Sequence, residues 1–329
     1  MPKFGLLILL LTLLVVAVMS LSIGSAAIPV TEVLLTLLGE DSSSVHKMIV
    51  VDIRLPRMFL AILVGASVAT SGAAIQGLFR NPLADPALIG VSGGAALFAA
   101  AYLVVGAELG IASMGIPASA FIGGLLATWL VLEVGRRGGT ISSMLLAGIA
   151  INAVTLSGVG MLTYLSTDVE LRSVAFWALG SLNGADWYGV AIATSVLPVI
   201  AIFLIRSEQL NAITLGDREA GHLGISVARL RIEIVVLTAL ATGVSVALCG
   251  VIAFIGLVVP HLVRMSLGSN HYMVIPGSAL LGGLLLLLAD SLSRSLLSPA
   301  ELPVGIITAL LGGPFFIYLI VRQKGRLGL

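Results

Sequence analysis

Charged residues are scarce in this sequence, and their scarcity excludes an ordinary water-soluble protein. Only 10% of the 329 residues are Asp, Glu, Lys or Arg, and lysine occurs just three times. A soluble domain of average composition carries about 25% charged residues. The sequence also has no long polar stretch that could fold as a separate soluble domain. The composition therefore predicts a single integral membrane domain over residues 1–329.

Other shortages exclude particular kinds of chemistry. Cys249 is the only cysteine, which rules out an intramolecular disulfide and any cysteine-rich metal or iron–sulfur site. The sequence has no Gly-x-x-x-x-Gly-Lys-Ser/Thr phosphate loop, so we do not expect this chain to hydrolyse ATP itself. The net charge of +1 gives no indication of a nucleic-acid partner. We expect no catalytic residue, cofactor or metal site in this chain.

Apolar residues, in contrast, make up 58% of the chain, and the mean hydropathy is +1.15. The 38 glycines favour helices that pack closely through small residues. A helix needs about 20 mostly apolar residues to cross a bilayer. We therefore predict an all-α integral membrane protein with about ten transmembrane helices, near residues 4–23, 57–79, 88–106, 116–134, 143–165, 189–206, 231–249, 251–268, 272–295 and 303–322.

The ends of the chain and its basic residues predict the orientation. The apolar run from Phe4 to Met19 exceeds the roughly 7–15 residues of a signal-peptide core, so we expect a retained first helix rather than a cleaved signal peptide. With the N-terminus inside, twelve basic residues, Lys324 and Arg326 among them, fall on the cytoplasmic side and five fall outside. The positive-inside rule requires a bias of this sign, so both termini are expected in the cytoplasm.

An internal repeat is visible at an offset of 178 residues. It aligns AILVGASVATSGAAIQGLFRNP with ALATGVSVALCGVIAFIGLVVP and pairs Ser67 with Ser245 and Gly72 with Gly250. A chance match among small residues is the alternative. If the repeat is real, the second predicted helix corresponds to the seventh, and five crossings separate them. The two halves would then run in opposite directions, and such inverted repeats are typical of transporters.

Several passages carry a more specific signal, and they follow one another in a characteristic order. They are RLPRMFLAILVGASVATSGAAIQGLFRNPLADPALIGVSGGA (54–95), WALGSL (177–182), LGDREAGHLGIS (215–226), GLVVPHLVRMSLGSNHYMVIPGSALLGG (256–283) and ADSLSRSLLSPAELPVGIITALLGGPFF (289–316). Over essentially its whole length the chain resembles the type II ABC importer permeases for iron-siderophore, haem and cobalamin. The resemblance implies a homodimer in the bacterial inner membrane, with two separate ATP-binding cassette subunits and a periplasmic binding protein. ATP and Mg would then be used by the partner ATPase.

The polar segment TLGDREAGHLGISVARLR, residues 214–231, lies on the predicted cytoplasmic side. Asp217 can cap a short helix, Gly224 can end it, and Ser226 can cap a second short helix that ends at Arg231. Taken alone, such a segment can be an ordinary positively charged loop. The resemblance instead assigns it as the coupling helices that contact the ATPase, through Leu215, Gly216, Asp217, Arg218, Glu219, His222, Leu223 and Gly224.

Three arginines expected on the outside, Arg54, Arg57 and Arg294, are candidates for docking the binding protein. Arginines that snorkel from helix ends are the simpler interpretation. In the resembling family, arginines at these motif positions receive acidic residues of the binding protein, and the guanidinium fork suits a carboxylate. Asp290 lies four residues before Arg294, a spacing that predicts an ion pair on one helical face.

The cytoplasmic gate is assigned from the resemblance to Asn81 and Leu83, in the turn RNPLADP, and to Ser142 and Ser143, at the start of the fifth predicted helix. Turn formation and helix capping are the simpler roles, and they suit Ser142 in particular. Two polar residues at membrane depth, Gln76 and Asn152, are expected to bond one helix to another rather than to line the pathway.

The cargo is the least determined feature. The passage TDVELRSVAFWALGSLNGADW, residues 167–187, looks closer to haem permeases than to those for iron-siderophores or cobalamin, so haem is the expected cargo and these are the alternatives. Haem iron takes His, Met, Tyr or Cys ligands. None of the four histidines, His46, His222, His261 and His271, is a persuasive ligand in the pathway.

Two other functions are compatible with parts of the sequence. GVSG at residues 90–93 matches the Gly-x-Ser-Gly of intramembrane serine proteases, with Ser92 as nucleophile and His261 as base, but no second feature connects these two residues. An ion-driven secondary transporter would fit the inverted repeat. It would need an acidic residue near the bilayer midplane, and the carboxylates available lie near helix ends, at Glu133, Glu233 and Asp290.

Overall fold

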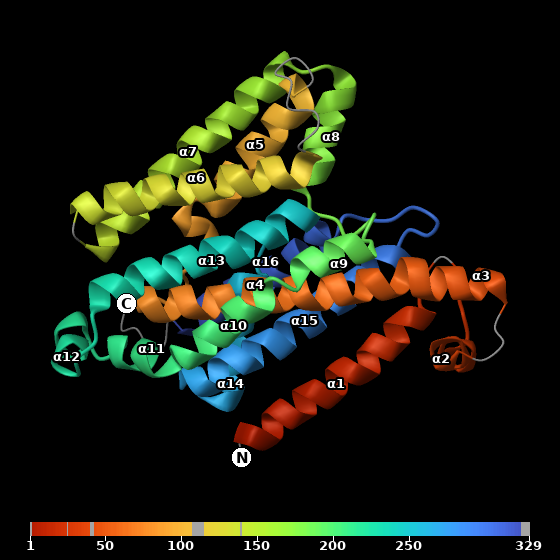
Figure 1. Ribbon diagram of the computed structural model, residues 1–329, viewed down its shortest axis with the longest axis horizontal. Coiled ribbons are helices and arrows are strands. Elements are labelled where there is room, and N and C mark those ends of the chain that lie inside the picture. Colours follow the sequence, from red (N-terminus) through yellow and green to blue (C-terminus); the bar gives the residue numbers. More distant parts are fainter. Residues whose placement is uncertain (1, 25, 40–42, 107–114, 139, 324–329) are drawn as a thin grey trace.

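The computed structural model describes residues 2–24, 26–39, 43–106, 115–138 and 140–323, and these residues form helices and connections without β-strands. Lys324 and Arg326 lie outside the described residues. The elements, shown in Figure 1, are α1 (Pro2–Ser22), α2 (Val30–Leu38), α3 (Ser44–Lys47), η1 (Met48–Arg54), α4 (Leu55–Phe79), η2 (Pro86–Ile89), α5 (Val91–Val105), α6 (Gly115–Gly138), α7 (Ile141–Leu165), α8 (Asp168–Ala178), α9 (Trp187–Ala193), α10 (Val196–Ile205), α11 (Ser207–Ile213), α12 (Asp217–His222), α13 (Val227–Cys249), α14 (Ile255–Leu267), α15 (His271–Ser295) and α16 (Val304–Gln323).

The expected membrane-spanning helices are all present. Within the described residues, seven helical stretches are long and apolar enough to cross a membrane, and three shorter helices are apolar. Seven plus three matches the ten predicted ranges. The seventh and eighth predicted helices, whose boundary was indistinct in the sequence, are separated by a break from Gly250 to Phe254. The φ angles of Gly250 (71°) and Phe254 (68°) are positive, which an α-helix does not allow.

Several short helices were not predicted, because they have fewer residues than a membrane span requires. They are α2, α8, α11 and the 3₁₀ turn η2, together with α3 and η1, which continue α4 back to Ser44 as one helical stretch. One of them has a clear sequence signature: at the start of α8 the Thr167 hydroxyl accepts from the Glu170 amide while the Glu170 carboxylate accepts from the Thr167 amide. This Thr-x-x-Glu capping box is readable in the sequence. The predicted helix 189–206 is also two helices, α9 and α10, which meet at Thr194 and Ser195.

The inverted repeat is visible in the packing. Helices α4 and α13 are in contact and run in opposite directions (Figure 1). Helix α4 packs against α15, and α13 packs correspondingly against α5, which the offset of 178 residues aligns with α15. Ser67 and Ser245, which the offset of 178 residues pairs, hydrogen-bond to each other with hydroxyl oxygens 2.9 Å apart. Equivalent residues can touch only near the axis that relates two repeats, so this bond marks that axis.

Helix α4 lies at the centre of the molecule, and glycine allows its neighbours to approach closely. A Cβ atom placed at Gly72 would lie 1.9 Å from the carbonyl oxygen of Gly256, and one at Gly65 would lie 2.3 Å from that of Gly282. Both distances are far shorter than any contact between atoms that are not bonded. The backbones of α14 and α15 therefore pack directly on α4, as small residues permit in membrane helices.

The helices place the candidate residues at two opposite ends of the molecule (Figure 1). One end holds the end of α4, the start of α13, and the short helices α11 and α12. The start of α1 and the end of α16 lie toward the same end. The other end holds α2, α3, the start of α4 and the end of α15. We call these the inner end and the outer end, following the predicted orientation.

Candidate functional site

The three arginines at the outer end come together in space but are not exposed. Arg54 and Arg57 lie where η1 passes into α4, and Arg294 lies in the last turn of α15. Their relative exposures are only 5%, 6% and 7%. A charged side chain this deeply buried needs compensating partners, and each of these arginines has them within the chain.

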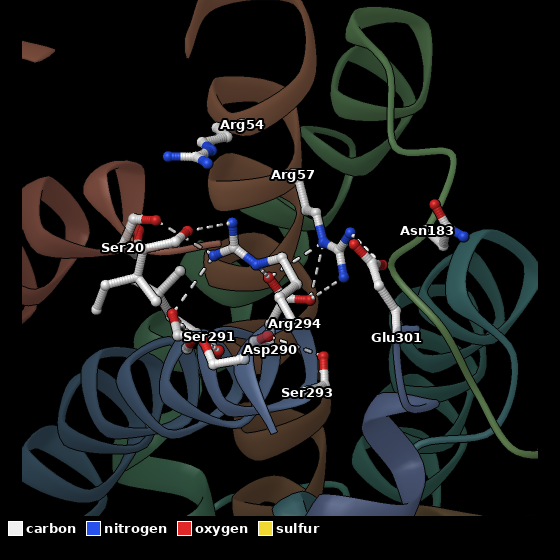
Figure 2. A network of polar contacts seen from close by, with 12 residues as sticks. Ser20, Arg54, Arg57, Asn183, Asp290, Ser291, Ser293, Arg294 and Glu301 are labelled. Carbon is white, nitrogen blue, oxygen red and sulfur yellow. Dashed lines mark hydrogen bonds and ion pairs between the residues drawn. The ribbon is translucent and has the colours of Figure 1, made fainter. Parts of the chain in front are cut away.

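Arg57 is held by two carboxylates on opposite sides of its guanidinium group (Figure 2). Its Nε donates to Asp290 Oδ1 at 2.9 Å, and its Nη2 also lies 2.9 Å from that oxygen. Its Nη1 lies 2.8 Å from Glu301 Oε2. The Asp290 side chain is completely buried, whereas 31% of the Glu301 side chain is exposed. One partner of Arg57 is thus sealed inside and the other reaches solvent.

Arg294 and Arg54 hold the end of α1, where helical carbonyl groups lack partners within the helix. Arg294 donates to the carbonyls of Ile23 at 3.1 Å and Ser20 at 3.3 Å. Arg54 donates to the carbonyl of Leu21 at 2.6 Å and to that of residue 26. The expected ion pair between Arg294 and Asp290 is confirmed, with Nε and Oδ2 3.2 Å apart. Asp290 therefore joins both arginines and connects α1, α4 and α15 into one network.

The docking role of these arginines stays a prediction, and the structure adds a condition to it. In this conformation no guanidinium group presents a free edge, because each faces a carboxylate or backbone carbonyls of its own chain. The segment that carries Glu301 lies between α15 and α16 and was not among the candidate residues. A contact between residues 244 positions apart leaves no local pattern from which Glu301 could have been found.

At the inner end, the segment 214–231 forms one short helix rather than two. Gly224 ends it as expected, in the left-handed region at φ 81°. The N-cap is Gly216 rather than Asp217, which occupies the first helical position. The prediction of a second short helix is wrong, because Ser226 precedes the 23-residue helix α13 and Arg231 lies within that helix. Movement of α12 would therefore act on a membrane helix through a single glycine turn.

Asp217 ties this short helix to two other elements. Its Oδ1 lies 3.2 Å from Nη2 of Arg80, and its Oδ2 lies 3.1 Å from Nη2 of Arg231. Arg80 follows the last residue of α4 and begins the turn that contains Asn81 and Leu83. The coupling candidates and two of the gate candidates are thus linked directly. Sequence reasoning missed Arg80 in this role, since a single arginine after a helix gives no signal of its partner.

The solvent-facing surface of α12 is partly apolar. Leu215 and Leu223, on either side of the helix, are 67% and 64% exposed, while Ala220 between them is buried. Arg218, Glu219 and His222 are exposed. An exposed apolar patch rimmed by polar side chains is one kind of protein-binding surface. The coupling residues remain a prediction that this surface fits.

The remaining gate candidates occupy a turn and a helix start. Asn81 accepts a hydrogen bond from the Leu83 amide at 2.9 Å, and the Leu83 side chain is 46% exposed. The cap of α7 is Thr140 rather than Ser142, because the Thr140 hydroxyl accepts from the Ser143 amide. The Ser142 side chain is exposed and forms no cap. These residues have the expected turn and helix-start positions, and their gating role stays a prediction.

The two polar residues at membrane depth bond helix to helix, as expected. Gln76 on α4 donates to the backbone carbonyl of Leu257 on α14 at 3.2 Å and accepts from Arg264. Asn152 on α7 donates to the carbonyl of Ala87 in η2 at 2.9 Å. These bonds satisfy polar groups that would be costly to leave unpaired in the membrane.

Asp85 is a polar residue that the sequence reasoning did not single out. Its carboxylate caps η2 by accepting from the Ala87 amide at 2.8 Å. With Ser92 it lines a cavity of about 260 Å³ beside the break before α14, which contributes Val251 and Phe254. Burial raises the pKa of the Asp85 carboxyl above its usual value. The cavity thus lies where the turn between α4 and α5, in the first half, meets the break between α13 and α14, in the second half.

The described residues contain no cluster of three His, Cys, Asp or Glu side chains suited to a metal ion. His271 is buried, with its Nδ1 2.7 Å from the Asn211 side-chain oxygen, and it joins α15 to α11. His46 lies 3.6 Å from Glu32 at the outer end.

Comparison with known proteins matches this architecture to one family. The model of the FecCD transport family matches residues 11–322. The chain is 44% identical over 327 residues to the hemin transport system permease protein HmuU of Yersinia pestis, covering 98% of this chain and 97% of that protein. It is 39% identical to the vitamin B12 import system permease protein BtuC of Klebsiella pneumoniae, covering 98% and 94%. A solved metal-chelate type ABC transporter in an inward-facing conformation is 33% identical, with a TM-score of 0.87 over 98% of this chain and all of that one.

The buried network predicts that Asp290 is the indispensable member of the outer cluster. Asp290→Asn removes the charge that compensates two buried arginines, and breaking such a pair costs about 3–5 kcal/mol. We expect a large fall in the thermal unfolding midpoint of the purified protein in detergent. Glu133→Gln is the control, because among the described residues Glu133 pairs with the exposed Arg136 and Arg137 alone. An exposed pair contributes roughly 0–1 kcal/mol, so equal effects of the two substitutions would contradict the assignment.

Proposed function

This chain belongs to the FecCD transport family and is the permease of an ABC importer, and we propose that it carries haem into the cytoplasm. The observation that carries the choice of cargo is the 44% identity to a hemin permease along nearly the whole of both chains. Relatives that import vitamin B12 are also similar, at 39–41% identity. Haem is therefore favoured by a modest margin over cobalamin, and an iron-siderophore is the other alternative.

The importer would consist of two copies of this chain, two ATP-binding cassette subunits and a periplasmic binding protein. The partner ATPase would bind ATP and Mg, since this sequence has no phosphate loop. The inner end would face the cytoplasm, in agreement with the distribution of basic residues. The surface that supports an ATPase contact is α12, with its two exposed leucines.

In the proposed cycle, closure of the ATPase pair moves α12, and Asp217 passes that movement to two membrane helices. Its contact with Arg231 connects it to α13, and its contact with Arg80 connects it to the end of α4. The Arg80 contact also reaches the turn of Asn81 and Leu83, our gate candidates. The charge pairs are partly exposed, so they would guide the movement without locking the gate in one state.

Replacing Arg80 tests this route. We expect Arg80→Ala to keep the complex assembled and hydrolysing ATP, but to lower the number of cargo molecules transported per ATP about fivefold, equivalent to roughly 1 kcal/mol of coupling. The measurement is the ratio of uptake to ATP hydrolysis in proteoliposomes. Arg229→Ala is the matched control, because Arg229 is an exposed basic residue at the same end. If both variants transport like the native chain, Arg80 has no part in coupling.

The cargo itself is tested by uptake into proteoliposomes that contain the complete complex. We expect ATP-dependent uptake of hemin that excess cobalamin reduces little. Each measurement uses the importer's own binding protein, so that delivery is the same with and without excess cobalamin. Preferential uptake of cobalamin, or of an iron-siderophore with neither of the other two, would refute the haem assignment and leave the importer assignment intact.

A further inference from the structure

We propose that Glu301 occupies the docking site in the absence of the binding protein, and that a carboxylate of the binding protein displaces Glu301 from Arg57. This inference rests on the proposed function, because it assumes that an acidic side chain of a partner docks at the outer end. It assigns a role to a residue outside the candidate docking set. It also explains how buried arginines can serve as a docking surface.

The two carboxylates that hold Arg57 differ in how easily they can leave. Asp290 is completely buried and is also paired with Arg294, so its removal would uncover two charges at once. Glu301 contacts only Nη1 of Arg57 among the ion pairs of the described residues, and its side chain is 31% exposed. Figure 2 shows it approaching Arg57 from the side opposite to Arg294. Glu301 is therefore the exchangeable partner.

Charge balance indicates the kind of group that can replace it. Arg54, Arg57 and Arg294 contribute three positive charges, and Asp290 and Glu301 contribute two negative charges. Departure of Glu301 alone would raise the excess from one positive charge to two in a nearly buried site, which is unfavourable. A carboxylate that arrives as Glu301 leaves preserves the balance, and it matches the donor geometry of the guanidinium edge. The ligand class is thus a carboxylate side chain on a protein surface.

Displacement would also release part of the chain. Glu301 lies in the non-helical stretch before α16, which begins three residues later at Val304. Near it, the Leu302 amide donates to the Ser293 carbonyl at 3.1 Å and the Leu302 side chain packs against the core, while the ion pair with Arg57 holds Glu301 itself. Docking would therefore loosen residues 296–303 and remove a constraint on the start of α16.

The direct test is the affinity of the complete complex for its binding protein. Glu301→Gln keeps the size of the side chain but removes the competing charge, so we expect the Kd to fall about fivefold. Asp52→Asn is the matched control, because Asp52 is an exposed acidic residue at the same end with no described ion pair to Arg57. We expect it to change the Kd less than twofold. Equal tightening by both variants would overturn the proposal in favour of long-range attraction.

A double-mutant cycle separates this proposal from docking itself. Arg57→Ala should weaken binding, and adding Glu301→Gln to it should then bring no tightening. If Arg57→Ala weakens binding but Glu301→Gln alone leaves the Kd unchanged, the displacement is refuted and docking at Arg57 stands. If Arg57→Ala has no effect, docking at this site fails and the displacement fails with it. Should Glu301→Gln fail to fold, Glu301→Asp, which keeps the charge but shortens the reach to Nη1, is expected to tighten binding in the same direction.

Release of the segment has its own readout. A nitroxide attached to Leu297→Cys is expected to become more mobile when the binding protein docks, because Leu297 is exposed on the segment that Glu301 restrains. The native Cys249 is buried, so labelling is specific to the new cysteine. A spectrum unchanged by docking, under conditions in which binding is saturated, would overturn the release.

Discussion

Close contact between backbones fixes α4 against its neighbours, and the positions of the groups at both of its ends follow from it. At Gly65 and Gly72 the backbones of α15 and α14 lie where a Cβ atom would be, so at these two positions the helices touch α4 with no side chain between them. Helices in a membrane gain little from a hydrophobic effect between them and associate through such packing. Because α4 is held this firmly, whatever is attached to its two ends is connected through a stiff element. Its outer end carries Arg54 and Arg57, and its inner end passes into Arg80.

The charged groups at the two ends of α4 differ in how deeply they are buried. At the outer end, the arginines are buried and compensated by Asp290, Glu301 and the carbonyls at the end of α1. At the inner end, Asp217 and Arg80 remain partly exposed, so their attraction is weakened by water. A buried network keeps one geometry until a partner of matching charge arrives, whereas an exposed pair can rearrange repeatedly. This contrast suits a docking site at one end and a coupling contact at the other.

Much of the fold follows from local sequence. Long apolar runs predicted the seven spanning helices and the three shorter apolar ones, and the repeated Gly-x-Ser-Val-Ala-x-x-Gly pattern predicted two halves of opposite direction. The contact between Ser67 and Ser245 was not predicted. The pair of Asp290 and Arg294 was predictable because both residues lie on one helix, four positions apart. The second coupling helix was predicted wrongly, since Ser226 marks a helix start equally well for a short helix and for the 23 residues of α13.

What could not be predicted are contacts between distant parts of the chain. Glu301 meets Arg57 across 244 residues, and Asp217 meets Arg80 only because α12 folds back beside the end of α4. The burial of Arg54, Arg57 and Arg294 was unforeseen for the same reason, because helix-end arginines look alike whether they face water or another helix. Asp85 was overlooked because it belongs to a turn by sequence, while the fold places it at a cavity between the two halves.

Whether ATP or an ion gradient drives uptake distinguishes an ABC importer permease from a secondary transporter. The purified complex would be placed in proteoliposomes in which ionophores abolish proton and sodium gradients, with ATP and Mg on the side of α12. The account predicts hemin transport that requires ATP and stops when the partner ATPase cannot hydrolyse it. Transport that follows an imposed proton or sodium gradient and ignores ATP would contradict the account.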